Sequence, residues 1–287
     1  MDILDYAFMQ RALIAAALVG VTAPAIGTYL VQRRQALMGD GLGHVAMTGV
    51  ALGFVLQSSP VWMATLVAVI GAVGMELIRT RGRTSGDVAL AMLFYGGLAG
   101  GVMIINLGGG QTASLLGSMF GSITTVAAED VTAMAILAAF VLAVAIGLRR
   151  QLFAVCQDEE FARVTGLPVR ALNLLMAVTA AVTVTVAMRI VGLLLVSAML
   201  VIPVAAAQRL TRSFATTLGL AMAISVTVSL TGTAATYYIN VPSGATIVLL
   251  AIGVFMVLTA LSAPLARRRA KAAQTAEEVC TRDDVKV

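Results

Sequence analysis

Charged residues are scarce in this chain: only 11% of its 287 residues are Asp, Glu, Lys or Arg, while 60% are hydrophobic. An ordinary soluble domain carries about 25% charged residues, which cover its surface. The composition therefore excludes a soluble enzyme and is typical of a protein that crosses a membrane many times. At about 20 residues per spanning helix, the length allows roughly eight to ten passes and leaves little for a soluble domain.

Residue types on which catalysis depends are also scarce. A single histidine, His44, excludes the His-Glu-x-x-His motif of metalloproteases. The only lysines, Lys271 and Lys286, follow no Gly-x-x-x-x-Gly loop that would cradle phosphates, so the chain is not expected to hydrolyse ATP by itself. Two cysteines, Cys156 and Cys280, fall in segments expected in the cytoplasm and indicate no disulfide framework. The chain is therefore predicted not to be an enzyme.

Nine apolar runs predict an all-α fold, a polytopic membrane helix bundle with eight or nine transmembrane helices. The runs are residues 12–31, 42–57, 61–78, 88–107, 131–148, 171–188, 190–208, 214–239 and 245–265. The run 42–57 is short, and it would lie in the membrane only when buried among other helices. Residues 1–265 are expected to form the transmembrane domain and residues 266–287 a polar cytoplasmic tail. Residues 108–128 are interpreted as a loop, a surface helix or a re-entrant segment.

The basic residues indicate how the helices are oriented. If the N-terminus is outside and all nine runs cross, 17 of the 19 Lys and Arg residues fall on the cytoplasmic side, which leaves Arg11 and Arg189 outside. Leaving out the run 42–57 would divide the arginine clusters between the two sides. The sequence therefore predicts nine passes, with the N-terminus outside and the C-terminus in the cytoplasm. The net charge of +5 reflects this topology and not binding of nucleic acid.

A carboxylate and the single imidazole lie four residues apart in Gly-Asp-Gly-Leu-Gly-His, residues 39–44. On a helix, Asp40 and His44 share one face and lie close enough to bind one ion. Ionisable groups are costly at membrane depth, which makes the pair a candidate functional site. Asp and His suit divalent zinc, manganese or iron(II), and a homodimer would supply four such ligands. In the structural alternative, Asp40 caps the helix and His44 bonds a backbone carbonyl.

Two longer stretches carry a resemblance to a known family. Residues 31–53 resemble the segment after the first helix in permeases of ABC importers for zinc, manganese and iron, with its Gly-Asp-Ala-Leu-Ser-His and Gly-Val-Ala-Leu-Gly patterns. Residues 189–207 are similar to the Val-Gly-x-Leu-Leu-Val-x-Ala-Leu-Leu-x-x-Pro-Ala-Ala-x-Ala signature of these permeases. Weaker matches at residues 83–87 and 160–167 keep the family's order.

The resemblance implies a fold like that of vitamin B12 and siderophore importer permeases. It also implies a permease in the bacterial cytoplasmic membrane that forms a homodimer, docks two separate ABC ATPase subunits and receives metal from an extracytoplasmic metal-binding protein. Zinc, manganese or iron would be the cargo, and no permanently bound cofactor is expected. Asp40 and His44 match the family pattern, whereas Gly41 and Gly43 replace its Ala and Ser, so a hydroxyl that would support His44 is missing.

Docking of the ATPase needs a cytoplasmic segment, and residues 203–214 are the first candidate. Pro203 is predicted to break the membrane helix, after which Gln208, Arg209 and Arg212 would face the partner. In related vitamin and siderophore importers the coupling helix follows the corresponding helix. In the simpler interpretation, these arginines only anchor the helix end on the cytoplasmic side. The segment around residues 158–166 is the second candidate.

Three classes of function remain open on the sequence. The first is the permease of a divalent-metal ABC importer. The second is a siderophore or cobalamin-type ABC permease, which has a related fold and does not need the Asp–His pair. The third is a stand-alone ion carrier, which would transport without an ATPase. The sequence does not select the metal, because zinc, manganese and iron(II) accept the same ligand types.

Overall fold

The computed structural model describes residues 6–81, 86–108, 127–193, 196–239 and 241–261, and these residues form helices and short connections without a strand. The elements are α1 (Ala7–Gln32), α2 (Met38–Val55), α3 (Pro60–Arg81), α4 (Gly86–Leu107), α6 (Ala128–Gly147), α7 (Arg149–Gln157), α8 (Glu159–Val164), α9 (Val169–Val191), α10 (Val196–Leu210), α11 (Phe214–Ile239) and a last helix, Ser243–Leu261. The predicted all-α class is confirmed. Residues 109–126 and 262–287 lie outside the described residues, so the predictions for the 108–128 segment and for the tail are not addressed.

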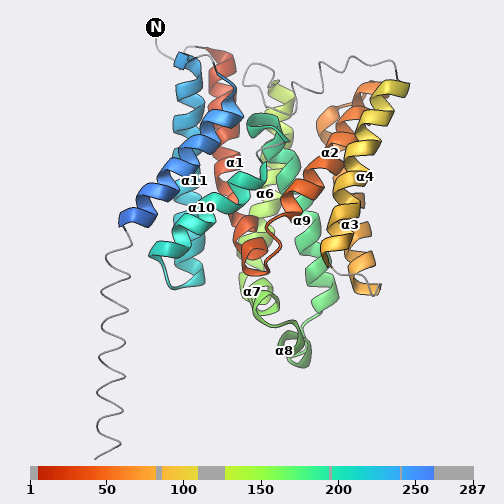
Figure 1. Cartoon of the computed structure of the whole chain (residues 1–287), viewed down its shortest axis with the longest axis vertical. Coiled ribbons are helices and arrows are strands. Elements are labelled where there is room, and N and C mark those ends of the chain that lie inside the picture. The colour runs from red at the N-terminus through yellow and green to blue at the C-terminus, as the bar shows by residue number, and fades with distance from the viewer. Residues whose placement is uncertain (1–5, 82–85, 109–126, 194–195, 240, 262–287) are drawn as a thin grey trace, which may run out of the picture.

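Seven helices of the described chain are long and apolar enough to cross a membrane: α1, α3, α4, α6, α9, α11 and the last helix. Helices α2, with 18 residues, and α10, with 15, are not among them. Together, the seven long helices, α2 and α10 match the nine predicted apolar runs in number and order. Figure 1 shows α2 and α10 inclined between steeper neighbours. The all-helical polytopic bundle is therefore confirmed, and the predicted eight or nine membrane helices fit the described chain roughly, since α2 and α10 are shorter than the other seven.

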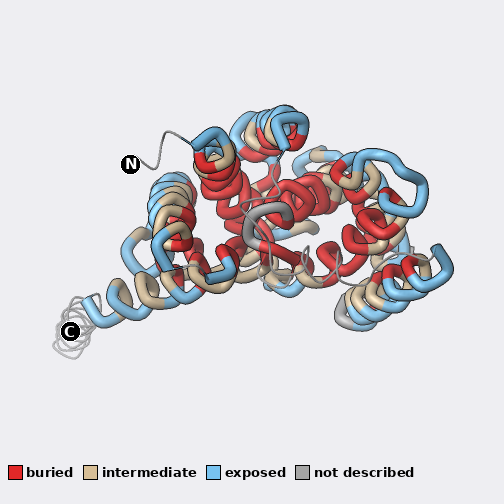
Figure 2. The backbone as a smooth tube through the Cα atoms, turned by 90° about the horizontal axis from the view of Figure 1, so that it is seen from above, coloured by how far each residue is buried: buried red, intermediate tan, exposed pale blue. Residues whose placement is uncertain are grey.

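Burial divides the bundle into an inner and an outer set of helices. In the most apolar 18-residue stretch of each helix, 72% of the residues are buried in α1 and 78% in α9. The buried share is only 22% in α4 and in the last helix. Seen from above, buried residues occupy the middle of the bundle and exposed residues its outside (Figure 2). Since exposed positions of α4 include Met92, Tyr95 and Met103, its outer face needs lipid or another protein to cover it.

Glycines bring the backbones of α2 and its neighbours unusually close. A Cβ added at Gly49 would lie 2.6 Å from the backbone of Ala64 on α3, and one at Gly97 on α4 would lie 2.6 Å from the backbone nitrogen of Val45. Such distances leave room only for hydrogen, so glycine is required at both positions. Helix α2 is therefore clamped between α3 and α4 through small residues.

Three local expectations differ from the structure. Helix α9 continues to Val191, so the boundary predicted between residues 188 and 190 is wrong; the chain breaks at Gly192, whose φ of 82° is favourable for glycine. Pro203 does not end its helix, because α10 continues to Leu210. The short helices α7 and α8 were not predicted, since neither has an apolar run long enough to stand out.

Candidate metal site

The site begins with the position of α2. The helix starts at Met38, so Asp40 and His44 lie in its first two turns, one turn apart. Close packing of α4 at Gly97 encloses His44, whose residue is only 7% exposed, while Asp40 is half-buried. The structure thus brings the predicted pair together on one face of a largely buried helix.

Asp40 is supported by a residue that the sequence did not indicate. The hydroxyl of Ser197 on α10 donates a hydrogen bond of 2.5 Å to Oδ1 of Asp40. Both residues lie in the first turn of their own helix, so the N-terminal ends of α2 and α10 both face the carboxylate. The hydrogen bond therefore links the N-terminal turns of α2 and α10 at the carboxylate of Asp40.

The structure does not show the alternative arrangement, in which Asp40 caps the helix and His44 bonds a backbone carbonyl. The N-cap of α2 is Leu37, which has no side-chain cap bond, and Asp40 lies inside the first turn. Nδ1 of His44 is buried and has no hydrogen-bond partner within the described residues. The imidazole packs instead against the ring of Phe94, with centroids 4.2 Å apart at an angle of 68°. A buried ring nitrogen without a partner is costly, and a metal ion would satisfy it.

A cavity of about 330 Å³ opens beside Asp40, between α2 and α4. Its lining consists of Leu37, Asp40, Leu90, Ala91, Phe94 and Tyr95. Leu37 is 65% exposed and Tyr95 is 68% exposed, so the cavity faces the outside of the single chain. Within the described residues no group of three or more His, Cys, Asp or Glu side chains could hold a metal. Asp40 and His44 thus offer two potential ligands per chain.

The residues predicted to contact an ATPase lie far along the chain from this pair. Gln208, Arg209 and Arg212 are exposed at the end of α10 and in the turn before α11, while Pro203 is buried inside α10. Helices α7 and α8 protrude at the end of the molecule opposite the N-terminus (Figure 1). Asp158 caps α8 by accepting hydrogen bonds from the backbone of Glu160 and Phe161, at 2.9 and 3.0 Å.

Helix α8 carries large apolar side chains that are exposed. Phe161 is 64% exposed and Val164 is 86% exposed, although the helix has only six residues and begins with two glutamates. Large exposed apolar side chains at the tip of a protruding element are typical of a contact with another protein. No strong pattern along the chain marks this surface, because both residues lie in a short polar segment.

Cys156 on α7 is not a candidate metal ligand. Its thiol is largely buried and lies 3.9 Å from the backbone oxygen of Tyr29. Burial raises the pKa of Cys156 to about 11, and the charge of Arg33 offsets this only in part. A buried thiol of this kind is unreactive, as is usual for a cysteine that only packs in the interior.

The sequence is similar to those of known membrane proteins. Residues 5–262 match the ABC 3 transport family. The chain belongs to this family. The manganese transport system membrane protein MntC of Halalkalibacterium halodurans is 32% identical over 254 residues, which cover 88% of this chain and 87% of that protein. The chelated iron transport system membrane protein YfeD of Yersinia pestis is 30% identical over 253 residues, covering 88% and 84%.

The fold agrees with this membership in the ABC 3 transport family. The solved structure of PsaBC from Streptococcus pneumoniae in complex with Fab contains a chain that superposes with a TM-score of 0.80 at 29% identity. The match covers 89% of this chain and 92% of that chain. The protein is thus a multi-pass membrane protein of an ABC transport family, and the predicted resemblance to metal-importer permeases is confirmed.

Proposed function

We propose that the chain is the permease subunit of an ABC importer for a divalent transition-metal ion, with Asp40 and His44 as ligands to the ion in transit. The observation that carries this proposal is the buried Nδ1 of His44, which has no partner in the described chain and lies one turn from a carboxylate. Relatives named for manganese and for iron transport support the cargo class. The donor set suits zinc, manganese and iron(II) alike.

A second copy of the chain completes the site in this proposal. The cavity beside Asp40 is open on the outer face of α2 and α4, and one chain offers two ligands. A homodimer that covers this face would supply two Asp and two His ligands and would close the cavity. It would also cover the exposed apolar side chains of α4.

The energy source in this proposal is a separate ABC ATPase, and an extracytoplasmic binding protein delivers the metal. The test is uptake of radioactive manganese or zinc into proteoliposomes that contain the permease, its ATPase and its binding protein. We expect uptake only with ATP and with all components. Uptake by the permease alone would instead identify a stand-alone carrier, and uptake of a siderophore or cobalamin but no free metal would identify the related class of permease.

The proposed location is the bacterial cytoplasmic membrane, with the N-terminus outside. In this orientation α7, α8 and the turn after α10 all lie on the cytoplasmic side, opposite the N-terminus (Figure 1). A reporter that is active only in the cytoplasm should give signal when it is fused after Val287 and none when it is fused before Met1. The reverse pattern would exclude this orientation.

The ATPase is proposed to dock on α8 together with the end of α10. Replacing Phe161 and Val164 by alanine should weaken capture of the ATPase in a pull-down, because exposed apolar side chains at the centre of an interface contribute most of its affinity. Charge reversal of Arg209 and Arg212 to glutamate tests the contribution of α10 in the same assay. Undiminished capture by both double variants would place the docking surface elsewhere.

Ser197 is expected to support metal binding through Asp40. Replacing Ser197 by alanine removes the donor of the 2.5 Å hydrogen bond and should weaken metal affinity about tenfold, as is usual for groups that orient a ligand. The Ser197→Thr variant keeps a hydroxyl and serves as the control. Equilibrium binding of zinc to the purified permease measures both. Equal affinities in the alanine variant and in the unchanged protein would show that the hydrogen bond has no role in binding.

A further inference from the structure

A group of five polar residues joins three membrane helices to α8 at the end of the molecule opposite the N-terminus. It consists of Arg33, just after α1, Glu76 and Arg79 on α3, Glu159 on α8 and Asn173 on α9, and we call it the basal cluster. Arg33 forms an ion pair with Glu159 and donates a hydrogen bond of 2.7 Å to Oδ1 of Asn173. The amide of Asn173 donates to Oε1 of Glu159 at 3.2 Å.

Glu159 is the shared partner of both arginines in this cluster. Arg79 binds Glu76 on its own helix through two hydrogen bonds, of 2.9 and 2.8 Å. Its Nη2 also lies 3.6 Å from Oε1 of Glu159. Both guanidinium groups thus lie beside the same carboxylate oxygen, which brings two positive charges close together. The carboxylate of Glu159 therefore offsets a repulsion between the segment after α1 and helix α3.

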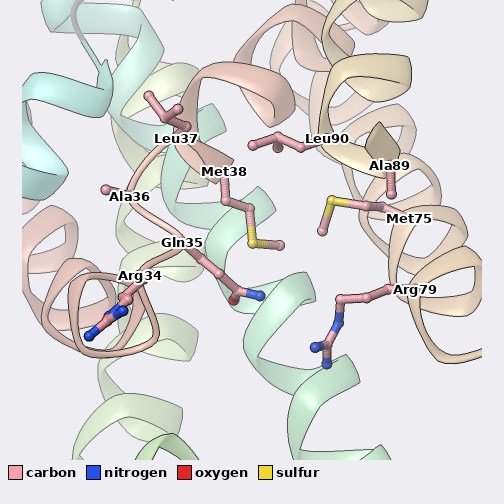
Figure 3. A pocket seen from close by; sticks show the side chains of 9 residues that line it. All are labelled: Arg34, Gln35, Ala36, Leu37, Met38, Met75, Arg79, Ala89 and Leu90. Atoms are coloured by element: carbon pink, nitrogen blue, oxygen red, sulfur yellow. The ribbon is translucent and has the colours of Figure 1, made fainter. Parts of the chain in front are cut away.

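The basal cluster adjoins a second cavity, of about 150 Å³, between α2 and α3. Side chains in its lining include Gln35, Met38, Met75 and Arg79. Figure 3 shows Gln35, Met38 and Met75 directed into this space, with Arg79 on one side and Leu37 and Leu90 on the other. Leu37 and Leu90 also line the cavity beside Asp40, so the two cavities are neighbours that share a wall.

We propose that the basal cluster is the inner gate of the metal path and that Glu159 is the residue through which α8 holds it closed. This inference rests on the proposed function, because the path begins at Asp40. In the closed state Glu159 holds the segment after α1 and helix α3 together beside this cavity. When α8 moves, Glu159 leaves both arginines, and their repulsion separates the segment after α1 from α3. After opening, Glu76 still pairs with Arg79, and the amide oxygen of Asn173 still accepts a hydrogen bond from Arg33.

The test measures access to the cavity directly. A cysteine at position 75, introduced as Met75→Cys in a chain with Cys156→Ala and Cys280→Ser, is labelled by a membrane-impermeant thiol reagent from the cytoplasmic side of vesicles that hold the complete transporter without ATP. The Glu159→Gln change should accelerate labelling at least about fivefold, because removing the shared charge shifts a two-state gate toward the open form. Glu160→Gln, which alters the adjacent exposed carboxylate, is the matched control and should leave the rate unchanged.

Removing one arginine charge as well should reverse the effect. In the double variant Arg33→Gln, Glu159→Gln the repulsion is absent, and labelling should return close to the original rate. Three outcomes would contradict the proposed gate. The Glu159→Gln and Glu160→Gln proteins could be labelled at equal rates, or the double variant could fail to restore protection. The third is rapid labelling before either change. Labelling needs no metal, so a failed gate is distinguishable from a failed metal function, which the dependence of uptake on Asp40 tests separately.

Discussion

Replacing Asp40 by asparagine, or His44 by alanine, should lower metal uptake by about 100-fold or more, because losing a ligand costs more than the roughly 10–100-fold typical of groups that only support one. Both variants remove a donor atom from the same face of α2. Neither enlarges a side chain, so insertion and packing should be preserved. Uptake of radioactive manganese by vesicles with the complete transporter measures the effect.

The control for these variants is Glu129→Gln, which removes an exposed carboxylate from the first turn of α6. It should transport at the normal rate. Because each chain of the proposed dimer supplies both ligands, mixed dimers with one altered chain should also bind metal more weakly. Normal uptake by both the Asp40 and the His44 variants would mean that the pair has only a structural role.

Gly97→Ala should destabilise the protein by about 1–3 kcal/mol, the usual cost of forcing extra volume into close packing. The added Cβ would lie 2.6 Å from the backbone nitrogen of Val45 and 2.7 Å from the carbonyl carbon of His44, so α4 must move away from α2. That movement would also break the hydrogen bond of 2.6 Å from Thr48 to the backbone oxygen of Gly97. We therefore expect a lower melting temperature and reduced uptake together.

Gly96→Ala is the matched control for this prediction. The two changes are chemically identical and adjacent on the same helix, but nothing lies within 4 Å of a Cβ added at Gly96, which is exposed. In a helix, alanine is favoured over glycine by about 1 kcal/mol, so Gly96→Ala should be neutral or slightly stabilising. Equal melting temperatures for the two purified variants would contradict the close contact between α2 and α4.

The sequence predicted the features that leave a local pattern. Asp40 and His44 stood out because two ionisable groups at helical spacing are rare inside an apolar run, and the long apolar helices were found because lipid requires about 20 apolar residues in succession. The boundary between α9 and α10 was placed wrongly, since the apolar stretch there is continuous and only the conformation of Gly192 breaks it.

Features that depend on distant residues left no such pattern. Ser197 contacts Asp40 across 157 positions, and nothing in its own apolar surroundings marks it as polar support for a ligand. The basal cluster draws its members from four separate segments, and Glu159 stands in a run of three acidic residues, 158–160, in which nothing local distinguishes it. Contacts between residues far apart in the sequence depend on how the helices pack, and the spacing of residues along the chain does not reveal that packing.

The short length of α2 has a consequence for how the protein is made. It carries five glycines, an aspartate and the only histidine in 18 residues, so lipid alone would hold it poorly as it leaves the ribosome. Its neighbours offer what lipid does not: α3 meets it at Gly49, and α4 meets it at Gly97. Helix α2 should therefore settle into the membrane only after α3 and α4 have been synthesised, so the segment that carries Asp40 and His44 depends on chain that emerges later.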